Sequence, residues 1–367
     1  MRRTPLYEIH KSLGATFGES AGWEVPERFG EPFEEYRAVR SRVGIFDLSS
    51  RGKLLLTGSD RVRFLQGMVT NDVKGLKEGE GCYAAMLTPQ GKVLTDLSVY
   101  VLPDAFLINV DAARKEVFKE TLEKHIIADD VKVKDVTESY GLLSVQGPEA
   151  PKLLAELFGG PMEGLEEFQH VERTIQDLPV RLIRRTWYTQ EEGYELLIPW
   201  DATAQVWEAL WEKGRAAGLQ PVGIAAFEIL RIEAGHLRVR VDMDETTLSL
   251  EAGLHRAISL TKGCYIGQEY VARITYRGHV NRQLVGMKIL GETVPRHREK
   301  IFAGEKEVGW VTSAVFSPHV MSPIALGYVR REHAEPGSQL QIAAEGILIP
   351  AEVVSLPFYR KRSAISD

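Results

Sequence analysis

The sequence predicts an α+β fold that is followed by a separate all-β module. Two observations support this prediction: helical and strand patterns alternate over residues 34–273, and only short strand patterns separated by turn residues follow Asn281. The length of 367 residues is enough for two or three domains, each with its own core. The final module is predicted to be a small antiparallel β-barrel or a jelly roll.

Composition and charge exclude several classes of protein. A net charge of -6 argues against broad nucleic-acid binding, which needs a basic surface. Two cysteines are too few for a disulfide framework, residues 1–5 lack a signal-like apolar segment, and no apolar run is long enough to cross a bilayer. We therefore expect a cytoplasmic protein without membrane contact. The nine histidines lack metal-ligand spacing, so no metal site is expected.

The first third of the chain contains helix and strand patterns with recognisable ends. Ser59 and Asp111 each stand directly before a helical pattern, where their side chains can accept a hydrogen bond from a free backbone N–H. The elements expected here are a helix over 34–43, strands over 45–48 and 52–57, and helices over 60–66 and 112–125.

Residues 92–102 form the most informative strand pattern. Five alternate positions from Val93 to Val101 are apolar or threonine, which is typical of a core face. The other face carries Asp96, Ser98 and Tyr100. A carboxylate beside a phenol suits a strand that lines a polar cavity, but an exposed strand face explains the pattern equally well.

The middle of the chain predicts a β-hairpin with two polar residues side by side. Residues 181–189 and 194–198 are strand patterns closed by the turn sequence at 190–193. If Thr189 pairs with Tyr194, Tyr188 stands directly opposite Glu195. The other elements expected here are strands over 131–136 and 141–145, and helices from 146 to 158, 200 to 214 and 227 to 233.

The C-terminal module is predicted from five short strands. They cover residues 284–290, 308–313, 325–329, 340–343 and 351–356. The charged run at 297–300 is interpreted as a solvated loop.

Residues 262–269, with the sequence Lys-Gly-Cys-Tyr-Ile-Gly-Gln-Glu, form the most distinctive motif. Cys264 stands between two glycines, near a lysine and just before a short helical pattern, a setting that favours a thiolate. The alternative is a buried structural cysteine, because free cysteine usually behaves as a small hydrophobic residue. The other motif residues are Lys262, Gly263, Gly267, Gln268 and Glu269.

This octet resembles the signature of the folate-binding, YgfZ-like family, which supports iron–sulfur enzymes and is related to the aminomethyltransferase (T-protein) of the glycine cleavage system. The likeness to the T-protein group extends nearly from end to end of the chain. The further similar strings are those at 6–7, 21–26, 44–49, 70–73, 146–148, 193–195, 230–235, 312–313 and 316–318.

The resemblance implies three domains in a cloverleaf around a central, folate-sized hole. Two of the domains would be α+β and interleaved in sequence, and the third would be the C-terminal antiparallel β-barrel. The boundaries expected are 1–50 with 140–250 for a folate-binding domain, 51–139 with 251–281 for a second domain, and 282–367 for the barrel.

The resemblance also implies the site residues and tetrahydrofolate, or a one-carbon derivative, as the ligand. Asp96 matches the aspartate that lies beside the reactive nitrogens of the folate in that group. Tyr188 and Glu195 match its tyrosine and its pterin-binding glutamate, and a carboxylate can accept both bonds from the 2-amino group and N3–H of a pterin. Tyr100 offers an aromatic face and a hydroxyl to the ligand. The T-protein pattern Gly-x-x-Ala-Arg-Asp-x-x-Arg falls on residues 223–231. Arg231 matches the second arginine of this pattern and is counted with the folate-binding residues.

Two departures from the T-protein pattern favour the YgfZ-like branch. Phe227 stands where the T-protein has an arginine that helps to hold its ligands, and the T-protein has no cysteine octet. Residues 256–288 also carry six basic side chains against one acid, which fits an acidic ligand or partner protein, or else a solvated basic face.

Three hypotheses for function follow. The first is a tetrahydrofolate-binding protein for iron–sulfur cluster assembly or repair, with Cys264 as the reactive thiol, Asp96 near the one-carbon site, and iron–sulfur assembly or client proteins as partners. The second is an aminomethyltransferase that takes its one-carbon unit from a lipoyl carrier. The third is a folate-dependent scaffold without turnover.

Overall fold

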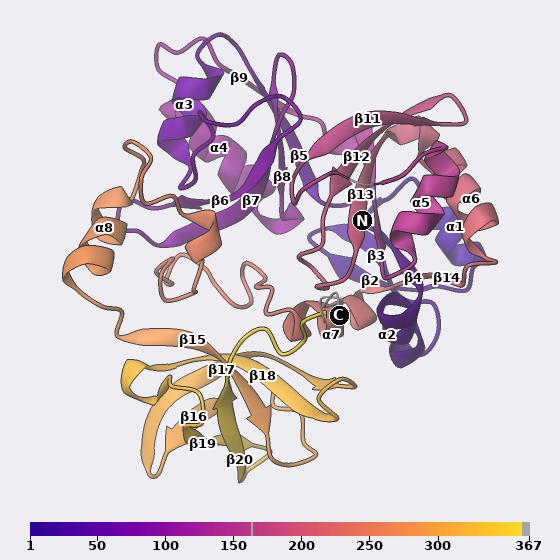
Figure 1. Ribbon diagram of the computed structural model, residues 1–367. Coiled ribbons are helices and arrows are strands. Elements are labelled where there is room, and N and C mark those ends of the chain that lie inside the picture. Colours follow the sequence, from indigo (N-terminus) through magenta and orange to yellow (C-terminus); the bar gives the residue numbers. More distant parts are fainter. Residues whose placement is uncertain (163, 362–367) are drawn as a thin grey trace, which may run out of the picture.

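Three lobes surround a middle region in which helix α7 (Ile224–Glu233) lies (Figure 1). The computed structural model describes residues 1–162 and 164–361. The fold confirms the predicted α+β class with a C-terminal barrel. No helix in the described part of the chain is long and apolar enough to span a membrane.

The first lobe is built on a six-stranded mixed sheet. Helices α5 (Ala150–Phe158) and α6 (Thr203–Gly214) pack on this sheet, and the buried Trp207 and Leu196 belong to the shared core. In sheet order the strands are β11 (His170–Ile175), β12 (Leu178–Arg184), β13 (Gly193–Pro199), β10 (Tyr140–Gln146), β4 (Val43–Asp47) and β14 (Leu219–Pro221).

The N-terminal segment adds a small sheet and two helices to this lobe. Its elements are β1 (Arg2–Arg3), α1 (Tyr7–Ser12), β2 (Thr16–Ser20), β3 (Trp23–Arg28) and α2 (Pro32–Ser41). The predicted helix over 34–43 is therefore present but begins and ends two residues earlier, because Pro32 occupies its first turn, where a missing N–H costs nothing.

The second lobe is a five-stranded sheet with α3 (Arg61–Met68) and α4 (Lys115–His125) on one face. Asp111 caps the short 3-10 turn before α4 by accepting a hydrogen bond from the Ala113 N–H, as predicted. The strand order is β6 (Gly81–Leu87), β7 (Val93–Val101), β8 (Phe106–Val110), β5 (Gly52–Thr57) and β9 (Lys132–Asp135), and α8 (Gln268–Arg277) lies beside it (Figure 1).

The C-terminal lobe is a closed antiparallel barrel, which decides between the two predicted architectures. The charged run at 297–300 was expected to be a loop, but its last residue, Lys300, begins strand β16. Lys300 is exposed while the next residue, Ile301, is buried in the barrel core, which is the alternation of a strand. Around the barrel the strands are β15 (Arg282–Ile289), β18 (Ser322–Arg330), β17 (Lys306–Ser317), β16 (Lys300–Ala303), β19 (Gln339–Ala344) and β20 (Ile347–Val354).

Strand β7 brings the polar residues of the second lobe to the middle of the molecule. Its apolar face, which includes Leu97 and Val99, packs against α3 and α4 in the core of its own lobe. The opposite face is also buried, since Tyr100 packs with Leu142 and Leu197 of the six-stranded sheet. The strand therefore lines the space between two lobes and is not an exposed strand face.

The predicted hairpin register is wrong. Strand β12 ends at Arg184, and Glu195 is paired with Ile183 rather than standing opposite Tyr188. The connection is an eight-residue loop, 185–192, because Thr186 bonds through both its N–H and its hydroxyl to Glu167, and the Gln190 N–H turns back to the Thr186 carbonyl. This loop is called the 185–192 loop below.

We propose the interleaved domain boundaries of the sequence prediction, because the sheets follow them. All the strands of the six-stranded sheet lie within residues 43–47 and 140–221, and all the strands of the five-stranded sheet lie within residues 52–135. The barrel strands begin at Arg282.

Candidate functional site

Glu195 is the most unusual polar residue of the protein. It lies on β13 with no exposed surface, and neither of its carboxylate oxygens has a hydrogen-bond partner among the described residues. The nearest cation is Arg185, whose Nε lies 4.0 Å from Oε1. Burial raises the pKa of Glu195, while Arg185 and Arg51 oppose the rise. A buried carboxylate without a partner is costly, so a ligand with hydrogen-bond donors is the expected complement.

Arg185 joins Glu195 to an aromatic wall. Its guanidinium carbon lies 4.4 Å from the ring centre of Phe168, 4.6 Å from that of Tyr188 and 5.5 Å from that of Trp187. The 185–192 loop thus places Tyr188 near Glu195 through Arg185, although the register that predicted this proximity is wrong. The Arg185 Nε itself is buried and has no partner in the described structure, which leaves a donor beside the acceptor Glu195.

Asp96 lies on the polar face of β7 with its carboxylate partly exposed to the space between the lobes. The hydroxyl of Tyr83 donates a hydrogen bond of 2.9 Å to its Oδ2. Burial raises the pKa of Asp96, and Asp111 adds to the rise, while Arg51 and the Tyr83 hydroxyl oppose it. Asp96 can therefore hold a proton closer to neutral pH than an ordinary aspartate, as a proton-transfer group requires.

Arg51 is the cation that acts on both carboxylates, and its own position is fixed by the second lobe. Its Nε donates to the Asn109 side chain at 2.7 Å. The buried ammonium of Lys53 donates to the carbonyls of Ser49 and Arg51, at 2.8 and 2.9 Å. Burial lowers the pKa of Lys53 to about 7.

His236 follows α7 and packs edge-on against the same aromatic wall. Its ring centre lies 4.8 Å from that of Tyr188 and 5.1 Å from that of Trp187. Its Nδ1 is buried without a hydrogen-bond partner in the described structure. Burial, with Arg185 and Arg231 nearby, lowers the pKa of His236 well below its usual value, so the ring is neutral.

A cavity of about 630 Å³ opens next to these groups, and it is called the large cavity below. Its inner wall contains Tyr83 and Trp187, whose rings are 4.1 Å apart, so the Tyr83 hydroxyl connects the cavity to Asp96. Three basic residues also line it: Arg256, Arg360 and Lys361. The volume is typical of a site for a small organic ligand.

The structure brings four of the predicted site residues together and leaves others apart. Tyr100, Tyr188 and Glu195 lie near Arg185, and Asp96 lies near Arg51, which also acts on Tyr188 and Glu195. The Tyr100 hydroxyl is buried without a partner in the described structure. Arg231 instead bonds Asp242 at 2.6 Å and Glu228 at 2.7 Å, in a buried cluster that joins α7 to the barrel.

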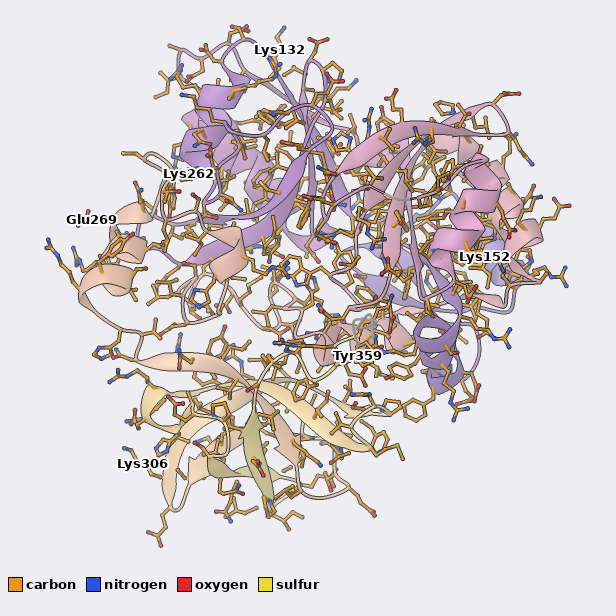
Figure 2. The ribbon with its side chains drawn as sticks, in the orientation of Figure 1. Lys132, Lys152, Lys262, Glu269, Lys306 and Tyr359 are labelled. Carbon is orange, nitrogen blue, oxygen red and sulfur yellow. The ribbon has the colours of Figure 1, made fainter. Side chains whose placement is uncertain are left out.

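The two ends of the octet, Lys262 and Glu269, lie at the edge of the molecule (Figure 2), while Tyr265 is buried in the core cluster that also contains Tyr83. Figure 2 shows Glu269 on α8 at the periphery, well separated from Tyr359 near the middle. The Lys262 ammonium donates to three backbone carbonyls of the second lobe, those of Gln66, Val69 and Asn71, at 2.6 to 2.9 Å. Its charge is therefore used to hold the chain in place and not to favour a thiolate.

The positions of Cys264 and Gly267 also bear on the role of the octet. Cys264 is exposed, it stands four residues before α8 begins, and it does not belong to the wall of the large cavity. Gly267 precedes α8 with φ 87°, and a Cβ there would lie 2.7 Å from the Thr88 carbonyl oxygen. Gly267 thus permits a close contact between α8 and the turn before β7.

Comparison with known proteins decides the family. The sequence matches the GCVT N-terminal domain over residues 6–262 and the glycine cleavage T-protein C-terminal barrel domain over residues 282–360. The chain belongs to the glycine cleavage T-protein family. An aminomethyltransferase of Halothermothrix orenii is 37% identical over 98% of this chain and 100% of its own length, and one of Streptomyces coelicolor is 35% identical over 99% and 98%.

A solved structure supports the same relation. The glycine cleavage system aminomethyltransferase T from Bartonella henselae is 29% identical, covers 98% of this chain and 99% of its own, and superimposes with a TM-score of 0.90. Proteins of the T-protein family use tetrahydrofolate.

These findings overturn the assignment to the YgfZ-like branch and to iron–sulfur cluster assembly or repair. The full-length relatives are named aminomethyltransferase, and no iron–sulfur assembly or client protein is supported as a partner. The two departures that favoured that branch have local explanations. Phe227 packs against Phe46 and Tyr188 at ring distances of 5.5 and 5.7 Å, and the octet holds α8 against the second lobe.

The sequence did not indicate several residues of the site. Arg51, Arg185, Trp187 and His236 occur in no recognisable motif, and each acquires its role from burial between the lobes. Tyr83 could have been found, since β6 pairs with β7 so that Ala85 stands opposite Asp96 and Tyr83 lies on the same face. Among residues 1–162 and 164–361, no group of three or more His, Cys, Asp or Glu side chains is placed to hold a metal ion.

Proposed function

We propose that this protein is an aminomethyltransferase, which moves a one-carbon unit from an aminomethyl-lipoyl carrier to tetrahydrofolate. The observation that carries the proposal is Glu195, a fully buried carboxylate that has no hydrogen-bond partner in the described structure. Arg185 lies between Glu195 and Trp187, a wall residue of the large cavity. The names of the full-length relatives supply the group that is transferred, an aminomethyl group. The lipoyl carrier is the donor that the resemblance to the T-protein implies.

The proposed pose of the folate follows from the charges around the site. Glu195 accepts hydrogen bonds from the 2-amino group and N3–H of the pterin, and the neighbouring Arg185 opposes the rise in its pKa that burial causes. Tyr188 and Trp187 supply aromatic surface for the rings. Arg256 and the basic residues near the chain end, Arg360 and Lys361, face the carboxylates of the glutamate tail in the large cavity.

The chemistry requires proton transfers and no oxidant or reductant. Two N–H bonds of tetrahydrofolate are replaced by bonds to the transferred carbon, the carbon–sulfur and carbon–amine bonds break, and the two protons leave on the amine and on the sulfur. Asp96 is placed to move one of these protons. Its raised pKa allows it to give a proton to the departing amine and to take one from a folate nitrogen.

A non-catalytic scaffold that only binds folate is the competing hypothesis. Incubation of the purified protein with an aminomethyl-lipoyl carrier and tetrahydrofolate distinguishes the two. An aminomethyltransferase forms methylene-tetrahydrofolate over many turnovers, and the Asp96→Asn variant forms it much more slowly. A protein that binds tetrahydrofolate without forming product would support the scaffold and contradict the proposal.

A further inference from the structure

The last described residues of the chain leave the barrel and return to the large cavity. Strand β20 ends at Val354, and residues 355–361, called the C-terminal strap here, cross over β15. A Cβ at Gly286 of β15 would lie 2.7 Å from Leu356 Cδ2 and 2.9 Å from Phe358 Cζ, so only glycine allows this close crossing without displacing the strap. Four residues of the strap line the cavity: Leu356, Pro357, Arg360 and Lys361.

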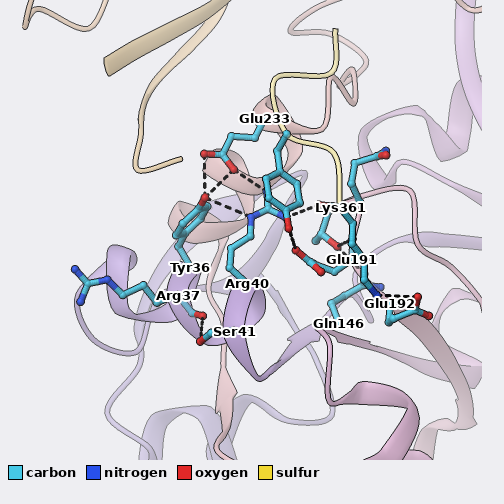
Figure 3. Close-up of polar contacts among 12 residues, drawn as sticks. Tyr36, Arg37, Arg40, Ser41, Gln146, Glu191, Glu192, Glu233 and Lys361 are labelled. Carbon is cyan, nitrogen blue, oxygen red and sulfur yellow. Dashed lines mark hydrogen bonds and ion pairs between the residues drawn. The ribbon is translucent and has the colours of Figure 1, made fainter. Parts of the chain in front are cut away.

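Tyr359 is a residue of the strap that does not line the cavity, and contacts with α2, the 185–192 loop and the end of α7 hold it in place. Figure 3 shows the polar contacts among its neighbours, which include Arg40, Glu191 and Glu233. The guanidinium carbon of Arg40, on α2, lies 3.6 Å from the centre of its ring. Its hydroxyl donates to Glu191 at 2.5 Å, and its backbone N–H donates to the Glu233 carbonyl at 3.0 Å.

The partners of Tyr359 are themselves tied to the site. Arg40 donates to the Glu233 carboxylate at 2.7 Å, to Glu191 at 3.2 Å and to the Thr189 carbonyl at 2.5 Å. Glu191 and Thr189 belong to the 185–192 loop, which carries Arg185, Trp187 and Tyr188. The contacts of Tyr359 therefore connect the two walls of the large cavity, the strap on one side and the 185–192 loop on the other.

We propose that Tyr359 is a positioning residue, which holds Arg360 and Lys361 at the cavity so that they meet the carboxylate tail of the bound folate. This inference rests on the proposed function. The argument is geometric: Tyr359 directly precedes these two basic residues, and its side chain is the part of the strap that is fixed to α2 and to the 185–192 loop. Without the Tyr359 side chain, Arg360 and Lys361 belong to a short segment with one side-chain contact left to the 185–192 loop among the described residues. That contact is the ion pair of Lys361 with Glu192, at 3.0 Å.

The test compares two ligands that differ only in the tail. Tetrahydrofolate carries the two carboxylates of the glutamate, whereas tetrahydropteroate ends at its p-aminobenzoate carboxylate, which lies closer to the pterin. Dissociation constants for both are measured by calorimetry with the wild type, Tyr359→Leu and Tyr359→Phe. Tyr7→Leu is the matched control, because Tyr7 also has an arginine over its ring, Arg3 at 4.0 Å, but does not line the large cavity.

We expect Tyr359→Leu to weaken tetrahydrofolate binding about tenfold and tetrahydropteroate binding by less than about twofold, since only the former loses charge-assisted contacts. Tyr359→Phe keeps the ring on Arg40 and loses the bond to Glu191, so it should fall between the wild type and Tyr359→Leu. The saturating transfer rate should stay near the wild-type value for both, because the reacting groups are unchanged.

A second measurement keeps the inference testable if Tyr359→Leu does not fold. Arg360→Gln alone should reproduce the selective loss for tetrahydrofolate, and its combination with Tyr359→Phe should show less than the sum of the two effects, because both act through the same side chain. The inference is refuted if the Tyr359 variants keep the wild-type ratio of tetrahydrofolate affinity to tetrahydropteroate affinity. Failure of the wild type to bind tetrahydrofolate would refute the proposed function as well.

Discussion

Replacement of Glu195 by glutamine should change ligand affinity and protein stability in opposite directions. Glutamine keeps the shape of the side chain but replaces one acceptor oxygen by a donor NH₂ group, which faces the donors of the pterin. The lost hydrogen bond to a charged group dominates the change, at about 1.5–3 kcal/mol, and a second bond is weakened. Tetrahydrofolate affinity should therefore fall by at least about tenfold and up to several hundredfold.

The effect on the free energy of unfolding follows from the burial of the Glu195 carboxylate, which has no hydrogen-bond partner among the described residues. Its raised pKa means that the native state favours the protonated acid, so the wild type loses stability as pH rises above 4.5, the ordinary glutamate value, and the loss is complete above the raised native pKa. Glu195→Gln has no such loss. At neutral pH the ligand-free variant should be as stable as the wild type or more stable, and the difference should shrink toward acidic pH.

The assay combines calorimetric titration with tetrahydrofolate and urea unfolding of the ligand-free protein at several pH values. Glu172→Gln is the control, because Glu172 lies on β11 of the same sheet and is exposed. Unchanged folate affinity in Glu195→Gln would refute the assignment of Glu195 to the pterin. A large loss of stability at neutral pH would show that the carboxylate serves Arg185 and not a ligand.

Three further predictions concern catalysis, a buried lysine and the two cysteines. Asp96→Asn should lower the saturating transfer rate by about a hundredfold or more while tetrahydrofolate binding changes little, as stopped-flow kinetics and calorimetry can measure. Lys53 has a native pKa of about 7 against 10.5 in the unfolded chain, so the unfolded state binds more protons between these values and the wild type gains stability as pH rises. Urea unfolding should show that Lys53→Met lacks about 2–3 kcal/mol of this gain between about pH 7 and about pH 9. Burial raises the pKa of Cys82 to about 12, whereas Cys264 is exposed, so limited alkylation at neutral pH should label Cys264 first, and Cys264→Ser should keep its transfer activity.

The sequence predicted the elements of this protein better than the contacts between them. Strand β7 and the barrel strands could be found because alternation along a strand depends on local burial, which the residue pattern records. The register of β12 and β13 could not, because the strand ends where Thr186 finds a better partner in Glu167, nineteen positions away. Contacts between distant segments leave no periodic signal in one sequence.

The octet shows how a specific motif can indicate the wrong branch of a family. Its residues predicted a reactive thiol, but the Lys262 ammonium is buried among carbonyls of another segment, nearly two hundred residues away in the chain. The site residues Arg185 and His236 were missed for the opposite reason. Each is an ordinary residue in sequence, and only packing in the folded protein buries its ring or side-chain nitrogen, Arg185 Nε or His236 Nδ1, without a partner among the described residues.

The most direct test of the central claim is a measurement of the products of one turnover. Wild-type protein is mixed with an aminomethyl-lipoyl carrier and excess tetrahydrofolate, and methylene-tetrahydrofolate, ammonia and free dithiol are quantified together. The proposed reaction predicts that the three appear in equal amounts and at the same rate, and that all three depend on tetrahydrofolate and on Asp96. Release of ammonia without methylene-tetrahydrofolate, or no product at all while tetrahydrofolate binds, would contradict the assignment of this protein as an aminomethyltransferase.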